Sequence, residues 1–170
     1  ISDPYLPKAG LVARIGRDGP GGVMLSAHSD VVPVEGQAWT RPPFELTRDA
    51  GRLYGRGTCD MKGYLAAMLS LAEQAGKAQP GKPMMLVISY DEEIGCLAAP
   101  ALAAHIKVTY NEQPKYAIIG EPTMMQPVVG QKGIVIYKTS VNGSAGHSSR
   151  IKTEVSAINE AARLILWLEN

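Results

Sequence analysis

Metal-competent and acid–base side chains stand at the ends of three apolar runs that the sequence predicts as buried strands. Each run is followed by such residues: His28 and Asp30 after 23–27, Asp91-Glu92-Glu93 after 84–90, and Glu121 after 116–119. A further acid, Asp60, opens a predicted helix. Because ligands of open α/β sheets bind at the carboxyl ends of the strands, we expect these side chains to converge on one place.

Carboxylates that converge in this way need a compensating charge. Like charges a few ångströms apart raise one another's pKa, and a divalent cation removes that cost. One imidazole with several carboxylates suits zinc, cobalt or manganese. A pair of such ions would polarise a carbonyl and activate a water together. Asp60 is the residue best placed to bridge them, because it offers two oxygens from the start of a helix. The set expected to converge is His28, Asp60, Glu92, Glu93 and Glu121.

Each feature has a common structural explanation when it stands alone. A histidine after a strand usually belongs to the core or the surface, an acidic triplet is usually a solvated turn, and an Asp at a helix start is usually a cap. Their occurrence together in one short chain favours a functional site. Other motifs fail. Asp60 occupies the third glycine position of the GxGxxG pattern that begins at Gly55. Cys59, a possible nucleophile, is expected to be a buried and inert thiol.

The elements expected to position these residues alternate between strands and helices. Apolar runs bounded by Gly and Pro predict strands at 11–15, 23–27, 84–88 and 116–119. Helical spacing predicts a helix over 61–75, which Gly76 is suited to end, and a weaker helix over 97–106. The first helix should bury Met61, Tyr64, Leu65, Met68, Leu69 and Ala72. The runs at 84–88 and 116–119 are apolar on both faces, which is typical of strands buried in a parallel sheet. We therefore expect an α/β domain over 1–130, with a mainly parallel sheet flanked by helices.

The pattern changes after about Val129. Residues 134–141 alternate polar and apolar, which predicts a half-exposed strand, and 154–168 carry apolar residues at helical spacing. The chain stops directly after this predicted helix, at Asn170. Residues 131–170 are therefore expected to begin a smaller α+β unit that is not finished within the chain.

Composition excludes several classes of protein. The 170 residues carry 17 Lys and Arg against 16 Asp and Glu, so no basic excess points to nucleic acid. No apolar run approaches the roughly 18 residues of a membrane span. The two cysteines form no CxxC pair, which suits free thiols in a reducing compartment and thus a cytoplasmic protein.

Five segments, in order along nearly the whole chain, resemble the M20 family of metallopeptidases and amide hydrolases. They are Ser26–Pro33, Leu53–Gly63, Asp91–Glu93, Gly120–Thr123 and Gly146–Ser149. The resemblance implies a zinc-exopeptidase-like catalytic domain over 1–130. It also implies that a lid and dimerisation domain begins at 131–170, that the protein is a homodimer, and that it uses two divalent ions, zinc first and cobalt as an alternative.

The same resemblance implies a set of metal ligands. His28 and Glu121 would bind different ions of the pair, and Asp60 would bridge them. Glu93 would bind one of the two ions, either the one held by Glu121 or the opposite one.

Three further residues acquire catalytic roles from the resemblance. Glu92 would be the general base that activates the bridging water. Asp30 would orient His28, and the i, i+2 spacing places both on one side of an extended chain. His147, in the second unit, would stabilise the oxyanion from a partner subunit.

Within the family, residues 34–40 and 55–63 are most similar to the acetylornithine deacetylases of arginine biosynthesis. This similarity implies a small N-acyl amino acid as substrate and conversion of N-acetylornithine to ornithine and acetate. Succinyl-diaminopimelate desuccinylase, or another deacylase or peptidase of the family, is the alternative. A non-catalytic metal-binding or dimerisation fragment is the alternative of a different class.

One departure from the family pattern concerns a ligand. The family has a further metal-binding histidine near its C-terminus, whereas this chain has three histidines, His28, His105 and His147. His105 lies in an Ala-rich, helix-like stretch and is expected to be structural. The chain is therefore expected to be a fragment that lacks one ligand and is a poor enzyme alone.

Overall fold

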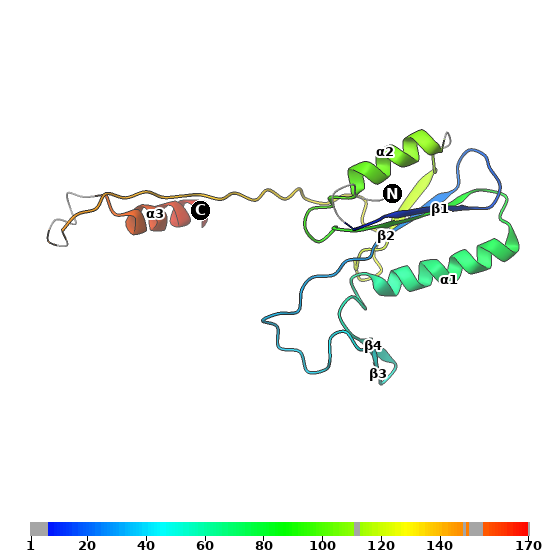
Figure 1. Cartoon of the computed structure of the whole chain (residues 1–170), viewed down its shortest axis with the longest axis horizontal. Coiled ribbons are helices and arrows are strands. Elements are labelled where there is room, and N and C mark those ends of the chain that lie inside the picture. The colour runs from blue at the N-terminus through cyan, green and yellow to red at the C-terminus, as the bar shows by residue number, and fades with distance from the viewer. Residues whose placement is uncertain (1–6, 111–112, 148, 150–154, 170) are drawn as a thin grey trace. The chain divides into compact units, whose positions relative to one another are not determined.

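A computed structural model describes residues 7–110, 113–147, 149 and 155–169. The chain divides into two compact units, Ile1–Pro127 and Val128–Asn170, which are treated separately below. The secondary structure of both units is drawn in Figure 1.

The first unit is built on a mixed, mostly parallel sheet of four strands. They lie in the order β1 (Leu11–Ile15), β5 (Met84–Ser89), β2 (Val23–His28) and β6 (Tyr116–Ile119). β2 pairs in parallel with β5 on one side and with β6 on the other, while β1 runs antiparallel to β5. The carboxyl ends of β2, β5 and β6 therefore share one edge of the sheet. This confirms the expected α/β class with a mainly parallel sheet.

Two helices cover opposite faces of this sheet. α1 (Lys62–Ala78) leads from β2 to β5, and α2 (Ala99–Thr109) leads from β5 back across β2 to β6. Right-handed crossovers that run in opposite directions place their helices on opposite faces, as Figure 1 shows. Pro100 stands in the first turn of α2, where its missing N–H costs nothing.

The alternation of β5 divides the core into two layers. Met84 and Leu86 face α1 and pack with Leu25, Ala27, Met61 and Met68. Met85 and Val87 face α2 and pack with Ala98 and Leu102. β5 is therefore buried on both faces, as its sequence predicts.

α1 differs from expectation at its end and on one face. It continues through Gly76 to Ala78 and ends at Gln79, whose left-handed backbone lets its N–H donate to the carbonyl of Ala75. Gly76 was therefore the wrong stop, because one glycine inside a helix is tolerated and the following Pro80 sets the boundary. Leu69 is 50% exposed and lies outside the core that Met68 enters.

Two strand predictions were wrong in part or in full. β6 forms, but each of its four residues is exposed, because β6 pairs only with β2 among the described strands and lies at the sheet edge. Residues 134–141 are described and contain no strand. Alternating polarity indicates which face a strand would bury, but a strand also needs a partner for its backbone, and none pairs with this segment in the described part of the chain.

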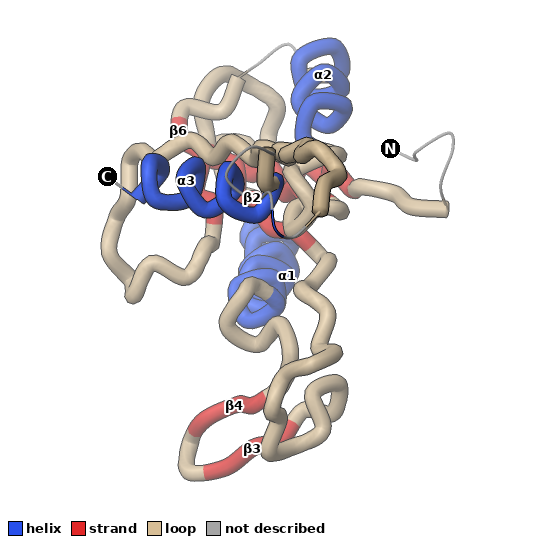
Figure 2. Tube along the Cα trace, turned by 90° about the vertical axis from the view of Figure 1, so that its left-hand side faces the viewer, coloured by secondary structure: helices blue, strands red, loops and turns tan. Residues whose placement is uncertain are grey.

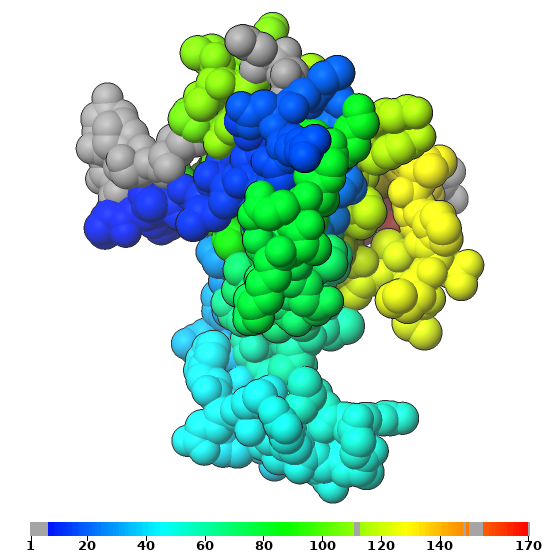
Figure 3. All heavy atoms as spheres, turned by 90° about the vertical axis from the view of Figure 1, so that its right-hand side faces the viewer, coloured from blue at the N-terminus to red at the C-terminus, as the bar shows by residue number. Residues whose placement is uncertain are grey.

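A hairpin lies between β2 and α1. β3 (Thr47–Asp49) and β4 (Arg52–Tyr54) pair through Ala50 and Gly51, whose φ values of 47° and 75° suit the two positive-φ positions of a type I′ turn. In Figure 2 the hairpin projects away from the sheet, and in Figure 3 its atoms form a separate lobe beyond α1.

The second unit contains one described helix, α3 (Ala157–Glu169). The expected helix began at Glu154, which lies outside the described residues. Before it, the Ser144 N–H donates to the carbonyl of Val155, and the Val155 N–H donates to the Ser144 hydroxyl. The apolar side chains Ile158, Ile165 and Leu168 are 81%, 57% and 68% exposed, so this face packs on no core among the described residues of the second unit.

We predict opposite outcomes for two neighbouring truncations on α1. Met68 is 2% exposed and Leu69 is 50% exposed. Met68→Ala should lower the free energy of unfolding by about 2–5 kcal/mol, because it leaves a cavity under the sheet. Leu69→Ala should cost less than about 1 kcal/mol. Thermal unfolding followed by circular dichroism measures both variants, and equal losses would contradict this core.

Candidate metal centre

His28 is the most deeply buried polar residue of the shared sheet edge. It is the last residue of β2 and 2% exposed. Its backbone N–H donates to the sulfur of Met61 at 3.3 Å, and Met61 is fully buried. Packing around the Met61 thioether therefore fixes the position from which the imidazole projects.

The imidazole is oriented by the chain that follows it. Nδ1 lies 3.0 Å from the backbone carbonyl of Asp30 and 3.4 Å from its carboxylate oxygen Oδ1. A carbonyl oxygen only accepts, so Nδ1 carries a proton and donates it. The other nitrogen, Nε2, therefore faces the site as the metal-competent atom. The other oxygen of Asp30 accepts from the Glu93 N–H at 3.1 Å, so Asp30 ties the ends of β2 and β5 together.

Asp60 reaches this imidazole from the start of α1. Its Oδ1 lies 3.1 Å from Nε2 of His28. Asp60 is not a helix cap, because the N-cap position of α1 is Met61 and no side chain caps the helix there. The peptide bond between Asp60 and Met61 is cis. The loop is held by Lys62, whose backbone N–H donates to Gly57 and whose ammonium donates to the carbonyl of Ser29.

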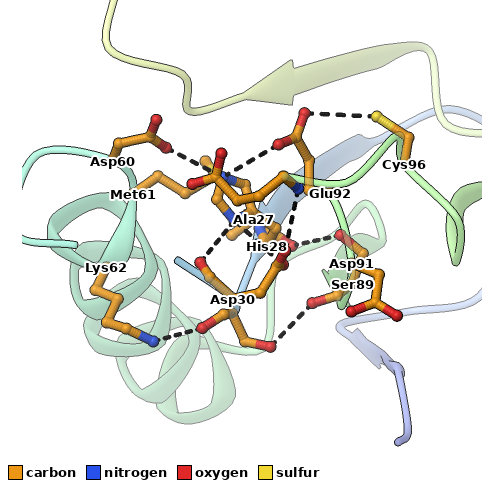
Figure 4. Close-up of polar contacts among 12 residues, drawn as sticks. Ala27, His28, Asp30, Asp60, Met61, Lys62, Ser89, Asp91, Glu92 and Cys96 are labelled. Carbon is orange, nitrogen blue, oxygen red and sulfur yellow. Dashed lines mark hydrogen bonds and ion pairs between the residues drawn. The ribbon is translucent and has the colours of Figure 1, made fainter. Parts of the chain in front are cut away.

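Glu121 and Glu92 bring two further carboxylates to the same nitrogen. Oε1 of Glu121 and Oε2 of Glu92 each lie 3.9 Å from Nε2 of His28. Figure 4 shows Asp60 and Glu92 on either side of the imidazole. One ligand atom each from His28, Asp60 and Glu121 lie within 4.8 Å of one another.

Glu121 is placed by close packing of β6 against α1. The Tyr64 hydroxyl donates to the carbonyl of Ile118 at 3.1 Å. A Cβ added to Gly120 would lie 2.0 Å from the Tyr64 ring, so only glycine fits between this ring and the chain that leads to Glu121.

The crowding of carboxylates shifts the pKa of several groups. Burial lowers the pKa of His28, but hydrogen bonds to Asp30 and Asp60 and the charge of Glu92 outweigh it, so the pKa lies above its usual value of 6.5. Burial raises the pKa of Glu93 and of Glu121, and the charge of Asp60 raises both further. The folded site therefore binds protons more tightly than separate side chains would.

These observations fit a divalent cation. Nε2 of His28 faces three carboxylates and no donor among the described contacts, so it needs either a proton or a cation between it and the oxygens. A donor set of one imidazole and several carboxylates is suited to zinc and to related ions. A cation there would replace the excess protons that the raised pKa values report.

The structure brings together most of the residues expected at the site. His28, Asp60 and Glu121 group as possible ligands, with Glu92 beside them. Glu93 is outside that group of three ligand atoms, yet its carboxylate is near enough that Asp60 and Glu92 raise its pKa.

His147 lies in the second unit, where it is exposed. Its Nδ1 lies 2.8 Å from the Ser149 hydroxyl oxygen and accepts from the Ser149 N–H at 3.3 Å. The neighbouring Ser148 lies outside the described residues.

Both cysteines are free thiols, as expected, but the exposure of Cys59 differs from expectation. Cys59 is exposed, so the prediction of a buried thiol was wrong, because the loop before α1 turns this side chain outward. Cys96 was not singled out, yet its thiol lies 3.5 Å from Oε1 of Glu92 and donates to it. The i, i+4 spacing of Glu92 and Cys96 was the only signal in the sequence. It predicts a contact only if the turn between the two residues is known.

Residues 24–165 match the family described as peptidase family M20/M25/M40, and the chain belongs to this family. It is 37% identical over 166 residues to an acetylornithine deacetylase of Aliivibrio fischeri (strain MJ11), which covers 96% of the chain and 43% of that protein. It is 38% identical over 168 residues to an acetylornithine deacetylase of Pectobacterium carotovorum subsp. carotovorum (strain PC1), which covers 97% and 43%.

Two solved structures share the fold. Human carnosine dipeptidase 1 matches with a TM-score of 0.55 and 31% identity, over 65% of this chain and 24% of that one. The M20 family metallo-carboxypeptidase Sso-CP2 of Sulfolobus solfataricus matches with a TM-score of 0.53 and 27% identity, over 65% and 25%. The chain thus spans less than half the length of the relatives it matches. No helix within the described residues is long and apolar enough to cross a membrane.

We predict that zinc stabilises the protein more at pH 7.5 than at pH 5.5. Raised pKa values mean that the folded, metal-free protein binds more protons than the unfolded chain. This contribution to stability is present at low pH and is lost as pH rises through the raised pKa values, upward from the usual 4.5 of Glu and 6.5 of His. A bound cation therefore adds most to the stability at the higher pH, where the site has lost these protons.

The measurement is the rise in Tm on adding zinc to EDTA-treated protein at the two pH values. His28→Ala should reduce the pH dependence, whereas His105→Ala, which removes an exposed histidine of α2, should preserve it. An equal rise in Tm at both pH values would contradict the electrostatic account.

Proposed function

We propose that this chain carries most of the catalytic centre of a metal-dependent amide hydrolase. The reaction would remove the acetyl group of an N-acetylated amino acid and convert N-acetylornithine to ornithine and acetate. The observation that carries the proposal is the group of His28, Asp60 and Glu121 with Glu92 beside it, in a member of the M20 family. The named relatives are acetylornithine deacetylases at 37–38% identity, which supports the choice of substrate.

The ligands in this proposal are His28, Asp60, Glu93 and Glu121, and they would hold two zinc ions, with cobalt as the alternative. The ions, when bound, supply positive charge that polarises the amide carbonyl and makes water a stronger acid. Asp60 would serve both ions because its carboxylate offers two oxygens beside Nε2 of His28.

The remaining groups act on protons and on the developing charge. The carboxylate of Glu92 takes a proton from the attacking water and returns it to the amide nitrogen as the C–N bond breaks. Asp30 keeps the imidazole of His28 in the tautomer that leaves Nε2 free for a cation. His147, from the other subunit of a homodimer, donates its Nε2–H to the oxyanion.

The setting proposed for this enzyme is arginine biosynthesis in the cytoplasm. The second unit would supply the lid and the dimer contact, for which the exposed apolar face of α3 is a candidate surface. The substrate would be a small molecule, not a nucleic acid or a membrane.

The test compares substrates on the full-length protein loaded with zinc or cobalt. We expect the highest kcat/KM with N-acetylornithine and much lower values with N-succinyl-diaminopimelate and with a dipeptide. Faster turnover of either competitor would move the assignment to another branch of the family. No turnover of any of the three, with metal bound at stoichiometric level, would favour a non-catalytic metal-binding or dimerisation module.

We predict that substitutions of Glu92 and Glu93 separate catalysis from metal binding. In the full-length protein, Glu92→Gln should leave metal content nearly unchanged and lower kcat by about 10²–10⁴-fold, the usual contribution of a general base. Glu93→Gln should weaken metal affinity, and added metal should restore part of the activity. Atomic emission and steady-state kinetics measure both effects. The reverse pattern would exchange the two roles, and wild-type kcat in Glu92→Gln would exclude Glu92 as the base.

A further inference from the structure

We propose that Lys8 and Asp91 form a positioning pair that fixes the direction in which Glu92 and Glu93 leave β5. The inference rests on the proposed function, because it concerns the carboxylates assigned there to proton transfer and to metal binding. It gives a role to β1 and to residues 7–10 before it, among which the structure groups no candidate ligand.

The pair follows from the antiparallel register of β1 and β5. Leu11 pairs with Ile88. Because the pairing is antiparallel, Lys8, three residues before Leu11, lies opposite Asp91, three residues after Ile88. The Lys8 ammonium lies 2.7 Å from each carboxylate oxygen of Asp91. A contact to both oxygens fixes the orientation of the carboxylate as well as its position.

Asp91 occupies an unusual position for an acid. It is 8% exposed and is the one acidic residue classed as buried in the described part of the chain. Its φ of 55° lies in the left-handed region, which side chains other than glycine seldom adopt. A buried charge persists only where surrounding contacts hold it.

The turn that begins at Asp91 determines where the next two side chains point. The Asp91 carbonyl accepts from Leu97, and the Glu92 carbonyl accepts from Gly95 and Cys96, so the turn is closed by its own backbone. Figure 4 shows the Asp91 side chain directed away from His28 while that of Glu92 is directed toward it. The left-handed conformation of Asp91 thus separates its carboxylate from those of the site.

Loss of the Lys8 charge would release this arrangement. Asp91 would then be an unpaired buried carboxylate next to the acids of the metal centre, and it would turn toward water. If the Asp91 side chain turned toward water, the backbone from which Glu92 and Glu93 project would move. Both metal affinity and the placement of the base should suffer, although neither Lys8 nor Asp91 touches the reacting atoms.

The experiment uses the full-length protein and four variants. Lys8→Met removes the charge and keeps the aliphatic stem, Lys8→Arg keeps the charge, and Asp91→Asn keeps a side chain that tolerates the left-handed region. The matched control is Lys77→Met, which removes an exposed ion pair of similar length, 2.6 Å to Glu73, elsewhere on the unit. Zinc affinity is measured by calorimetry, and kcat and KM are measured separately.

We expect Lys8→Met and Asp91→Asn each to weaken zinc affinity and to lower kcat at saturating zinc by about 10–100-fold, with little change in KM. Lys8→Arg should recover most of both losses, and Lys77→Met should match the wild type. A Lys8→Met or Asp91→Asn protein with a lower Tm but wild-type zinc affinity and kcat would overturn the proposal and leave the pair a purely structural one. An equal loss in Lys77→Met would overturn it as well.

Zinc affinity keeps this test separate from that of the proposed function. If the wild type binds zinc but hydrolyses none of the proposed substrates, the proposed function fails while the zinc measurements still decide whether the pair positions Glu93. If the wild type is active and the variants are unaffected, only the positioning pair fails.

Discussion

Three carboxylates surround one imidazole nitrogen at the carboxyl edge of the sheet, and the rest of the first unit accommodates that concentration of charge. Nε2 of His28 lies 3.1 Å from Asp60 and 3.9 Å from both Glu92 and Glu121. Such a cluster is unfavourable unless protons or a cation compensate it, and the raised pKa values of His28, Glu93 and Glu121 show this cost in the folded chain. The same cluster of carboxylates favours the binding of a metal cation.

The topology explains how residues far apart in sequence reach one point. β2 lies between β5 and β6, and all three run in the same direction, so the loops that follow them leave from the same edge. The helices on the two faces pack against the strands, and α1 also positions the segments at the carboxyl ends of β2 and β6. Met61 at the start of α1 supports His28, and Tyr64 one turn later supports the end of β6.

β1, the antiparallel strand of the four-stranded sheet, approaches the site from the opposite direction. Because β1 runs against β5, the segment that enters β1 lies beside the exit of β5, where Lys8 contacts Asp91. A parallel strand at that edge would present its carboxyl end there, and with it a different segment of the chain. The antiparallel pairing of β1 therefore places the Lys8 ammonium at the sheet edge where the parallel strands place their carboxylates.

The sequence by itself determined which side chains could do the chemistry and most of the elements that carry them. Runs such as 84–88 and the helical spacing after Asp60 report local preference and burial, which are encoded residue by residue. The resemblance of five short segments to the M20 family agrees with the family match of residues 24–165.

Only the tertiary structure decided what depended on neighbours distant in the chain. The exposure of β6, the absence of a strand at 134–141 in the described residues and the outward Cys59 depend on which partners are present, and no local pattern contains that information. The pairing of Lys8 with Asp91 likewise depends on strand register. Register brings together side chains separated by 83 residues in the Lys8–Asp91 pair, and such a contact has no periodicity to reveal it.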